Sequence, residues 1–366
     1  MRAVVNMKTL KRILTRLALA TNVIFALLLF VCGWSAELNP AEYSRLSLMG
    51  LAFPLLLLIN IGFIVFWLVF NIYYIWFPIV GMLCSFSYIY DYFPLNWNKK
   101  APDGALKVMT YNNEYYGQAE KDENGNYPVV DYMANSGADI ICVQEGGFSK
   151  GLTARTVDEI MSAAGYRIRR IKDRKSEPQV VYSKLPVISV CRVPYESSTN
   201  GSVAVELLYD GDTVLVINNH FESYKLSVKD KEKYKEILNN PEGADTDDNT
   251  RALIRKMAKA SSIRGPQVDS VFSYINKVGH DAVIVCGDFN DSPISYSCRR
   301  LSSRLTDVFR QSGCGLGWTY NQSGLNFRID HIFVSDYWQS YSTHVDKTAL
   351  WSDHYPLITY LKKRKK

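Results

Sequence analysis

The chain has 366 residues with a formal net charge of +6, and 47% of its residues are hydrophobic. Residues 1–100 carry eight Lys or Arg and three Asp or Glu, so the rest of the chain is left close to +1. This balance excludes the broad basic footprint of a dedicated nucleic-acid-binding domain, and none of the seven cysteines has the C-x-x-C spacing of a zinc or redox site.

Two long uncharged segments lie near the start of the chain. Residues 17–36 contain no charged side chain, and neither do residues 46–90. Because about 20 apolar residues span a bilayer, the first segment fits one transmembrane helix (17–36) and the second fits two (46–69 and 73–92), joined by a turn near Asn71. A signal peptide would also explain the first segment, but it lacks a small-residue cleavage site around Trp34 and leaves the second segment unexplained. We therefore expect a membrane anchor with three transmembrane helices over residues 1–92.

The charges that flank these helices predict an orientation. Four Lys or Arg residues lie between positions 8 and 16, whereas the loop after the first helix holds two Glu and one Arg. Since positive residues favour the cytoplasmic side, the N-terminus is expected in the cytoplasm and the domain after three crossings on the outer (periplasmic or extracellular) side. Lys99 and Lys100, after the third helix, argue weakly for the opposite orientation.

Residues 93–104 contain Pro and charged residues and are expected to form a linker. Short runs rich in Val, Ile and Tyr follow, bounded by Gly, Pro, Asn or Asp, and they predict strands at 106–112, 139–145, 178–184, 202–209, 213–220, 281–288 and 327–335. Helices are expected at 127–136, 153–164, 228–239 and 248–277, with the last one broken at Gly265–Pro266. Residues 105–366 therefore predict one α/β layered domain.

Polar residues gather where these predicted strands end. In VIVCGDFNDSP (283–293), Asp288 and Asn290 lie two positions apart and project from the same face of an extended chain. Ligands of open sheets bind at the carboxyl ends of strands. Other runs place comparable side chains at or near an end: Asn112 and Glu114, Glu145, His220, Asp330, and Asp353 with His354.

Each of these residues alone has a simple structural explanation, since an Asp after a strand is usually a turn residue or a helix cap. Six such runs together are better explained by one site. Hard divalent cations such as Mg²⁺ take oxygen ligands, and clustered acids without a cation would repel one another. The set predicts a metal site with catalytic histidines beside it.

The ordered motifs TYNNE, VQE, NNH, GDFNDSP, RIDHI and SDHYP resemble the endonuclease/exonuclease/phosphatase superfamily, which has the deoxyribonuclease-I-like fold. The resemblance covers residues 105–361, and GDFN with the distant SDH is its specific part. It implies a four-layered α/β sandwich, with two packed β-sheets flanked by helices and the site at one end. With the anchor, the expected fold is this sandwich preceded by three transmembrane helices.

The resemblance also implies a role for each matching residue. Glu145 would be the main ligand of Mg²⁺ or Mn²⁺, with Asn112 supporting it and Asp353 serving the metal region; the role of Glu114 as a ligand stays open. Asp288 would activate the attacking water, and Asn290 would hold water or phosphate. His354 would stabilise the phosphate charge, Asp330 would pair with a catalytic histidine, and His220 would assist the leaving oxygen.

These residues predict a membrane-anchored, metal-dependent hydrolase of phosphodiester bonds, with a nuclease as the first expectation. The membrane tether makes a phospholipid or inositol-phosphate substrate a second one. A non-catalytic binding protein on the same fold is disfavoured because the motif residues are all present. Transport by the helices is disfavoured because their interiors hold no ionisable residue. The bilayer and the substrate are the expected partners, and no obligate protein partner is predicted. Arg264, near the predicted helix break, could touch phosphate, but a solvated position at a helix end is the first expectation.

Overall fold

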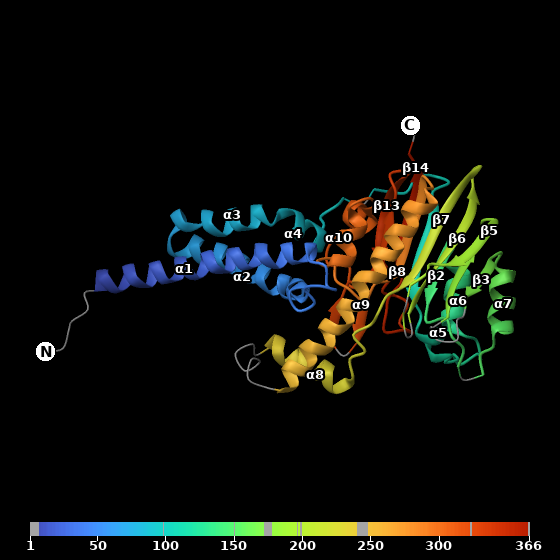
Figure 1. The fold of residues 1–366 in the computed structure, drawn as a ribbon, viewed down its shortest axis with the longest axis horizontal. Helices are drawn as coiled ribbons and strands as arrows, with labels where there is room; N and C mark the ends of the chain where they lie inside the picture. Colours follow the sequence, from blue (N-terminus) through green and yellow to red (C-terminus); the bar gives the residue numbers. More distant parts are fainter. Residues whose placement is uncertain are drawn as a thin grey trace.

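The computed structural model describes residues 7–97, 99–149, 151–171, 178–195, 197, 200–239, 248–322 and 324–364. The predicted start of the anchor at residue 1 and the predicted end of the catalytic domain at residue 366 lie outside this part of the chain. The anchor helices extend to one side of a layered α/β domain, with the start of α1 far from that domain (Figure 1).

The anchor is a bundle of apolar helices. It comprises α1 (Met7–Trp34), η1 (Ser35–Glu37), η2 (Leu46–Ala52), α2 (Phe53–Phe70), η3 (Ile72–Tyr74), α3 (Trp76–Cys84) and α4 (Phe86–Tyr92). Met7–Glu37 and Leu46–Phe70 are each long and apolar enough to cross a membrane, and α3 and α4 make a third span only if the bent pair counts as one. The predicted third transmembrane helix over 73–92 corresponds to two helical pieces, which meet at 67° around Ser85. Gly and Ser residues are common at sharp bends, and Gly81 and Ser85 lie at this one.

Two six-stranded sheets form the centre of the following domain. The first has the order β13 (Trp338–Val345), β14 (Leu357–Lys363), β1 (Leu106–Asn112), β2 (Ile140–Gln144), β4 (Gln179–Ser183) and β3 (Arg167–Ile171). The second has the order β5 (Val187–Arg192), β6 (Gly201–Tyr209), β7 (Asp212–His220), β8 (Ala282–Asp288), β12 (Asp330–Val334) and β9 (Thr306–Asp307). A hairpin of β10 (Tyr320–Gln322) and β11 (Leu325–Phe327) is separate.

Alternation along the strands builds the four layers. In β8, Ile284 and Cys286 face the core between the sheets, whereas Val283 and Val285 face the outer helices. Helices α6 (Pro128–Asn135) and α7 (Ala154–Ala163) cover the first sheet, and α9 (Asp248–Val278) and α10 (Tyr296–Ser302) cover the second. The remaining helices are α5 (Glu114–Gln118), α8 (Val228–Asn239) and α11 (Val308–Ser312). The predicted four-layered sandwich is confirmed.

Helix α9 continues through the point where a break was predicted. Pro266 lies inside it, so the expected helix end at Gly265–Pro266 was wrong. Met257 on one side of the proline and Val268 and Ile275 on the other are all buried. Tertiary packing of both halves therefore outweighs the backbone hydrogen bond that proline removes.

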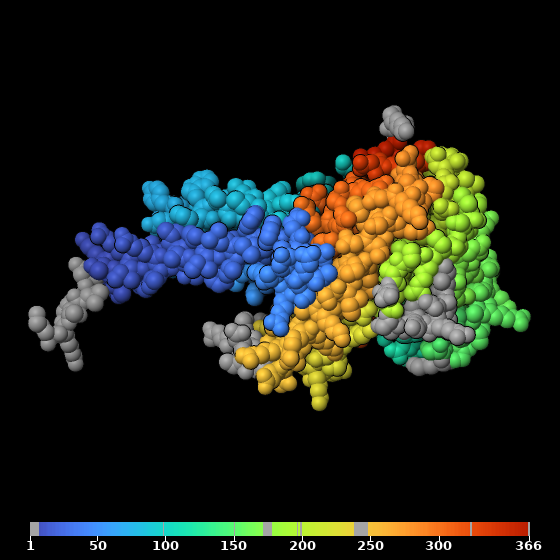
Figure 2. Space-filling model, viewed as in Figure 1, coloured from blue at the N-terminus to red at the C-terminus, as the bar shows by residue number. Residues whose placement is uncertain are grey.

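The anchor packs closely on the α/β domain. Ile294, which follows the GDFNDSP motif, lies in the same buried cluster as Leu29 and Phe53 of the anchor. In Figure 2 the anchor residues around position 50 lie directly against α9. The expected linker also makes contacts, since Leu95 forms a β-bridge with Cys314. Ion pairs add to this interface at Glu37–Arg299 and Asp91–Arg310.

Candidate active site

Parallel strand pairs bring the predicted residues to one edge of the sandwich. In the first sheet, β1 and β2 run parallel with Asn112 opposite Gln144, so Asn112 and Glu145 end side by side. In the second sheet, β7 and β8 run parallel with His220 opposite Asp288. Strand β12 is antiparallel to β8, so its first residue, Asp330, is the partner of Asp288. His354 precedes β14, which is antiparallel to β1.

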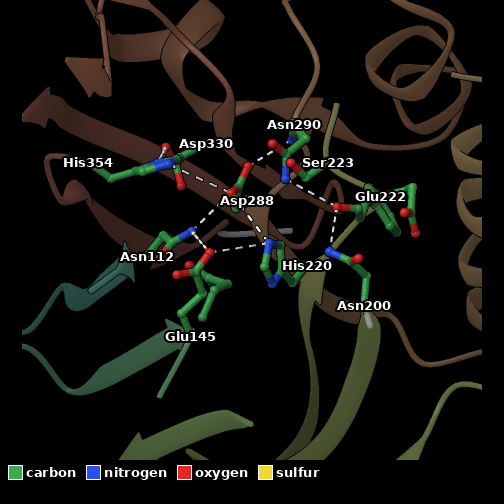
Figure 3. A network of polar contacts seen from close by, with 12 residues as sticks. Asn112, Glu145, Asn200, His220, Glu222, Ser223, Asp288, Asn290, Asp330 and His354 are labelled. Carbon is green, nitrogen blue, oxygen red and sulfur yellow. Dashed lines mark hydrogen bonds and ion pairs between the residues drawn. The ribbon is translucent and has the colours of Figure 1, made fainter. Parts of the chain in front are cut away.

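Asn112 joins the two sheets at this edge. Its Nδ2 donates hydrogen bonds to Glu145 Oε1 at 3.2 Å and to Asp288 Oδ2 at 3.1 Å. Figure 3 shows the amide between the two carboxylates. Because the carboxylates come from different sheets, this side chain fixes the distance between them.

Two histidines flank Asp288. The Nε2 atoms of His220 and His354 lie 3.7 Å and 3.8 Å from Asp288 Oδ2. The Nδ1 atom of His354 is 2.8 Å from Asp330 Oδ2, which orients this imidazole. All four side chains are at least 95% buried. The predicted pairing of Asp330 with a histidine is thus present in the structure.

Burial and mutual repulsion set the charges of this cluster. Loss of hydration raises the pKa of Asp288, and the nearby histidines only partly offset it. Burial likewise raises the pKa of Glu145, against the effect of His220. For His354, burial alone would lower the pKa, but the carboxylates of Asp330 and Asp288 outweigh it and raise that pKa well above its ordinary value.

The backbone at three of the predicted site positions has a positive φ. Glu145 has φ 56°, Asn290 has φ 50° and Glu114 has φ 45°. The conformation is unusual for a glutamate, and such residues concentrate at functional sites. Asn290 is held by two hydrogen bonds, from its N–H to Asp288 Oδ1 at 2.7 Å and from its Nδ2 to the carbonyl of Phe221 at 3.1 Å.

The donor set fits a hard divalent cation. Ligand atoms of Asp288, Asp330 and His354 lie within 4.8 Å of one another. However, the raised pKa of His354 favours its protonated form, which cannot bind a metal. The carboxylate oxygens of Glu145 suit Mg²⁺ or Mn²⁺ better, whereas Oδ1 of Asn112 accepts a hydrogen bond from the N–H of Glu114 at 3.3 Å. The excess of buried carboxylate over cationic charge is the feature that a bound cation would relieve.

Glu114 and Asp353 lie at the margin of this cluster. Glu114 Oε2 accepts a hydrogen bond from the backbone N–H of Asp353 at 3.2 Å, and its Oε1 accepts one from Gln118. Glu114 lines a neighbouring surface pocket rather than the catalytic one, whereas Asp353 lines both. Glu114 thus holds the loop before His354, and a metal role for Asp353 stays a prediction.

Sequence reasoning missed several residues that support the site. Ser352 Oγ donates to the carbonyl of Asn112 at 2.8 Å and accepts from the N–H of His354. The ring of Tyr320 packs edge-on against His354, with centroids 5.2 Å apart. Ser352 could have been suspected as the Ser of SDH, but nothing near Tyr320 in the sequence marks it.

Arg264 was also misjudged, because it is fully buried rather than solvated. One guanidinium nitrogen donates to the carbonyl of Glu222 at 2.7 Å, and Nε lies 3.4 Å from Asp291 Oδ2. Burial alone would lower the pKa of Arg264, but Asp291 and Tyr224 raise it. Since Asp291 follows Asn290, Arg264 contacts the loop that carries Asn290.

Comparison with known proteins adds two sequence matches. The sequence model of the Endonuclease/Exonuclease/phosphatase family matches residues 112–354. Residues 12–92 match a domain of unknown function, DUF8431. No curated protein sequence matches the chain significantly.

Solved structures also match the chain. The catalytic domain of human Nocturnin, with a bound sulfate anion, has a TM-score of 0.51 at 15% identity, covering 71% of this chain and 94% of that one. The 3′ phosphatase NExo from Neisseria, bound to a product DNA hairpin, has a TM-score of 0.48 at 18% identity, covering 71% and 100%. A family protein from Bacteroides vulgatus has a TM-score of 0.48 at 14% identity, covering 72% and 100%. The Nocturnin match shows a shared fold.

Proposed function

Because this chain belongs to the endonuclease/exonuclease/phosphatase family, we propose that it is a membrane-anchored, divalent-metal-dependent hydrolase of phosphodiester bonds. The observation that carries the proposal is the convergence of Asn112, Glu145, His220, Asp288 and His354 at one edge of the sandwich. Phosphoryl transfer requires positioning and charge neutralisation, and this cluster offers acidic, amide and imidazole groups for both.

The residues divide the reaction between them. A water molecule held by Asp288 attacks phosphorus, and its proton passes to that carboxylate as the new P–O bond forms. The ester P–O bond breaks in line, and the leaving oxygen takes a proton from His220. Protonated His354, oriented by Asp330, stabilises the charge on the phosphoryl oxygens, and Asn290 positions the water or the phosphate.

Glu145 would hold the divalent cation, with Asn112 supporting that carboxylate through its Nδ2 hydrogen bond and Asp353 at the margin. The cation, when bound, supplies neutralisation of the phosphate charge. Nucleic acid is the substrate class first expected from the family, and a phospholipid is the second. A nuclease and a phospholipid phosphodiesterase would share this chemistry.

Hydrolysis of bis(p-nitrophenyl) phosphate by the full chain in detergent, with Mg²⁺ added, tests the proposal. Asp288→Ala and His354→Ala are each expected to lower kcat by roughly 10³-fold, because each removes a group acting on the transition state. Asp336→Ala and His344→Ala are matched controls, since these residues lie outside the site and are exposed. Wild-type rates in both site variants would refute the assigned roles.

The location of the domain is a proposal of its own. The flanking charges favour a cytoplasmic N-terminus and a catalytic domain on the outer side. Cys191 and Cys314 are exposed on that domain. A membrane-impermeant maleimide should therefore label them in intact cells, and labelling only after permeabilisation would reverse the orientation.

A further inference from the structure

The catalytic pocket has an apolar side that the catalytic chemistry does not require. The pocket has a volume of about 230 Å³, and its lining includes Asn112, Glu145, His220, Asp288 and His354. The same lining includes six Leu, Ile, Met or Phe side chains: Leu51, Leu226, Met257, Leu325, Phe327 and Ile329. We call this second set the apolar wall.

The apolar wall is built mainly by elements outside the two central sheets. Met257 comes from α9, and Leu325 and Phe327 come from the β10–β11 hairpin. Leu51 comes from η2 of the anchor and lies within the candidate span Leu46–Phe70. The membrane anchor thus contributes a side chain to the pocket that contains the catalytic residues.

Aromatic rings connect the wall to the catalytic centre. Tyr320 contacts His354 edge-on at 5.2 Å and stacks on Phe327 at 6.5 Å between centroids. Tyr234 of α8 packs edge-on against Phe327 at 5.9 Å. The pocket is therefore continuous from the catalytic histidine to the apolar wall.

Two lysines line the same pocket as the catalytic residues and the apolar wall. These are Lys225 and Lys231, and Lys225 is paired with Glu222 at 2.8 Å. The Nζ of Lys231 lies 5.6 Å from the centroid of the Tyr320 ring, which contacts both His354 and Phe327. Cationic and hydrocarbon side chains within one pocket define an amphiphilic site.

Resting on the proposed function above, we propose that the substrate is an amphiphilic phosphodiester of the lipid class. Its phosphate lies at Asp288 and His354, and its hydrocarbon chain follows the apolar wall toward the bilayer beside Leu51. Burial of a chain there is favourable, whereas the charged backbone of a nucleic acid would lose hydration against Leu, Met and Ile without gaining partners. Bases can stack on Tyr and Phe rings, so an oligonucleotide is the alternative that the test includes.

A matched series of diesters separates these possibilities. Methyl, butyl and octyl p-nitrophenyl phosphate share the scissile bond and the leaving group and differ only in the length of the chain. They are assayed below their critical micelle concentrations with the full chain in nanodiscs, beside a single-stranded DNA oligonucleotide. We expect kcat/KM to rise along the series, by at most roughly fourfold for each methylene group that the wall buries.

Two wall variants and one control locate the effect. Leu51→Gln and the nearly isosteric Met257→Gln are each expected to lower the octyl-to-methyl ratio of kcat/KM by roughly threefold to tenfold. Leu46→Gln is the control, because Leu46 belongs to the same 3-10 helix but is exposed and does not line the pocket. The use of a ratio corrects for any loss of active protein.

The outcomes distinguish this inference from the proposed function. Equal kcat/KM for methyl and octyl diesters, or a higher value for the oligonucleotide than for either, overturns the amphiphilic substrate while leaving a phosphodiesterase. If the preference for longer chains is unchanged in both wall variants, the hydrocarbon chain does not bind along the apolar wall. Hydrolysis of no diester and no oligonucleotide refutes the proposed function itself, and this inference with it.

Discussion

Gly50 is the position where the contact between anchor and catalytic loop can be tested with a single methyl group. A Cβ atom built at Gly50 would lie 2.2 Å from the carbonyl oxygen of Ile294. Since non-bonded heavy atoms are comfortable at roughly 3.5 Å, Gly50→Ala forces η2 and the Ile294 backbone apart by about 1 Å. The atom that the new Cβ would meet is a backbone carbonyl oxygen and not the end of a flexible side chain. The clash can therefore be relieved only by moving the backbone.

The size of the expected effect on stability and activity depends on how close the displaced backbone lies to Asn290. Overpacking of this kind costs about 1–3 kcal/mol of folding free energy. Ile294 lies only four residues after Asn290, and a shift of about 1 Å in catalytic groups can lower a rate by roughly 10²-fold. We therefore expect Gly50→Ala to lower kcat/KM on bis(p-nitrophenyl) phosphate by between roughly tenfold and hundredfold, and to lower Tm as well.

Gly62→Ala provides the matched control. Gly62 lies in α2 of the same anchor, and a Cβ there meets nothing within 4 Å. Activity is measured for the full chain in detergent, and unfolding is followed by circular dichroism. If Gly50→Ala and Gly62→Ala have the same activity and the same Tm, the anchor does not constrain the catalytic loop as the structure indicates.

Three further predictions concern the site and the surface. Treatment with EDTA should abolish hydrolysis and Mg²⁺ or Mn²⁺ should restore it, whereas full activity after exhaustive chelation would exclude the cation role of Glu145. Asp330→Asn removes the charge that faces His354 Nδ1 at 2.8 Å, so kcat should fall roughly 10- to 150-fold, the equivalent of about 1.5–3 kcal/mol; an unchanged kcat would contradict the positioning role. Hydrogen bonds from Lys256 and the Ser227 backbone lower the pKa of Asp230 to about 2 from 3.8. This carboxylate therefore stabilises the fold above its unfolded pKa and loses that effect as the pH falls toward 2, with solvent screening limiting it to less than about 1 kcal/mol. Urea unfolding of wild type and Asp230→Asn should accordingly differ at neutral pH and converge near pH 2.

The sequence predicted the strands that end in polar residues better than it predicted the remaining strands. Asp288 and Asn290 were recognisable because an apolar strand ends in a run of polar residues, and β8 indeed ends at Asp288. Strands such as β13 and β14 were missed. Trp338–Val345 mixes polar and aromatic residues, and its register shifts between Tyr341 and His344. Local pattern is weak where a strand carries such a bulge.

Long-range packing explains the wrong expectations. Pro266 is a local signal for a helix end, but Met257 and Val268 are both held in tertiary contacts that local sequence does not encode. Arg264 was expected to be solvated because arginine usually is. Its burial depends on Asp291 and Glu222, which lie far from it in the chain. Asp291 forms an ion pair with the guanidinium, and the carbonyl of Glu222 accepts a hydrogen bond from it.

The sequence by itself determined the apolar anchor, the layered α/β class and the chemical types of the catalytic groups, since these follow from hydrophobic periodicity and from short motifs. Only the tertiary structure decided that Leu51 of the anchor borders the catalytic pocket and that Asn112 bridges carboxylates from two sheets. Both are contacts between segments distant along the chain. Their geometry depends on how whole layers pack, which no local pattern specifies.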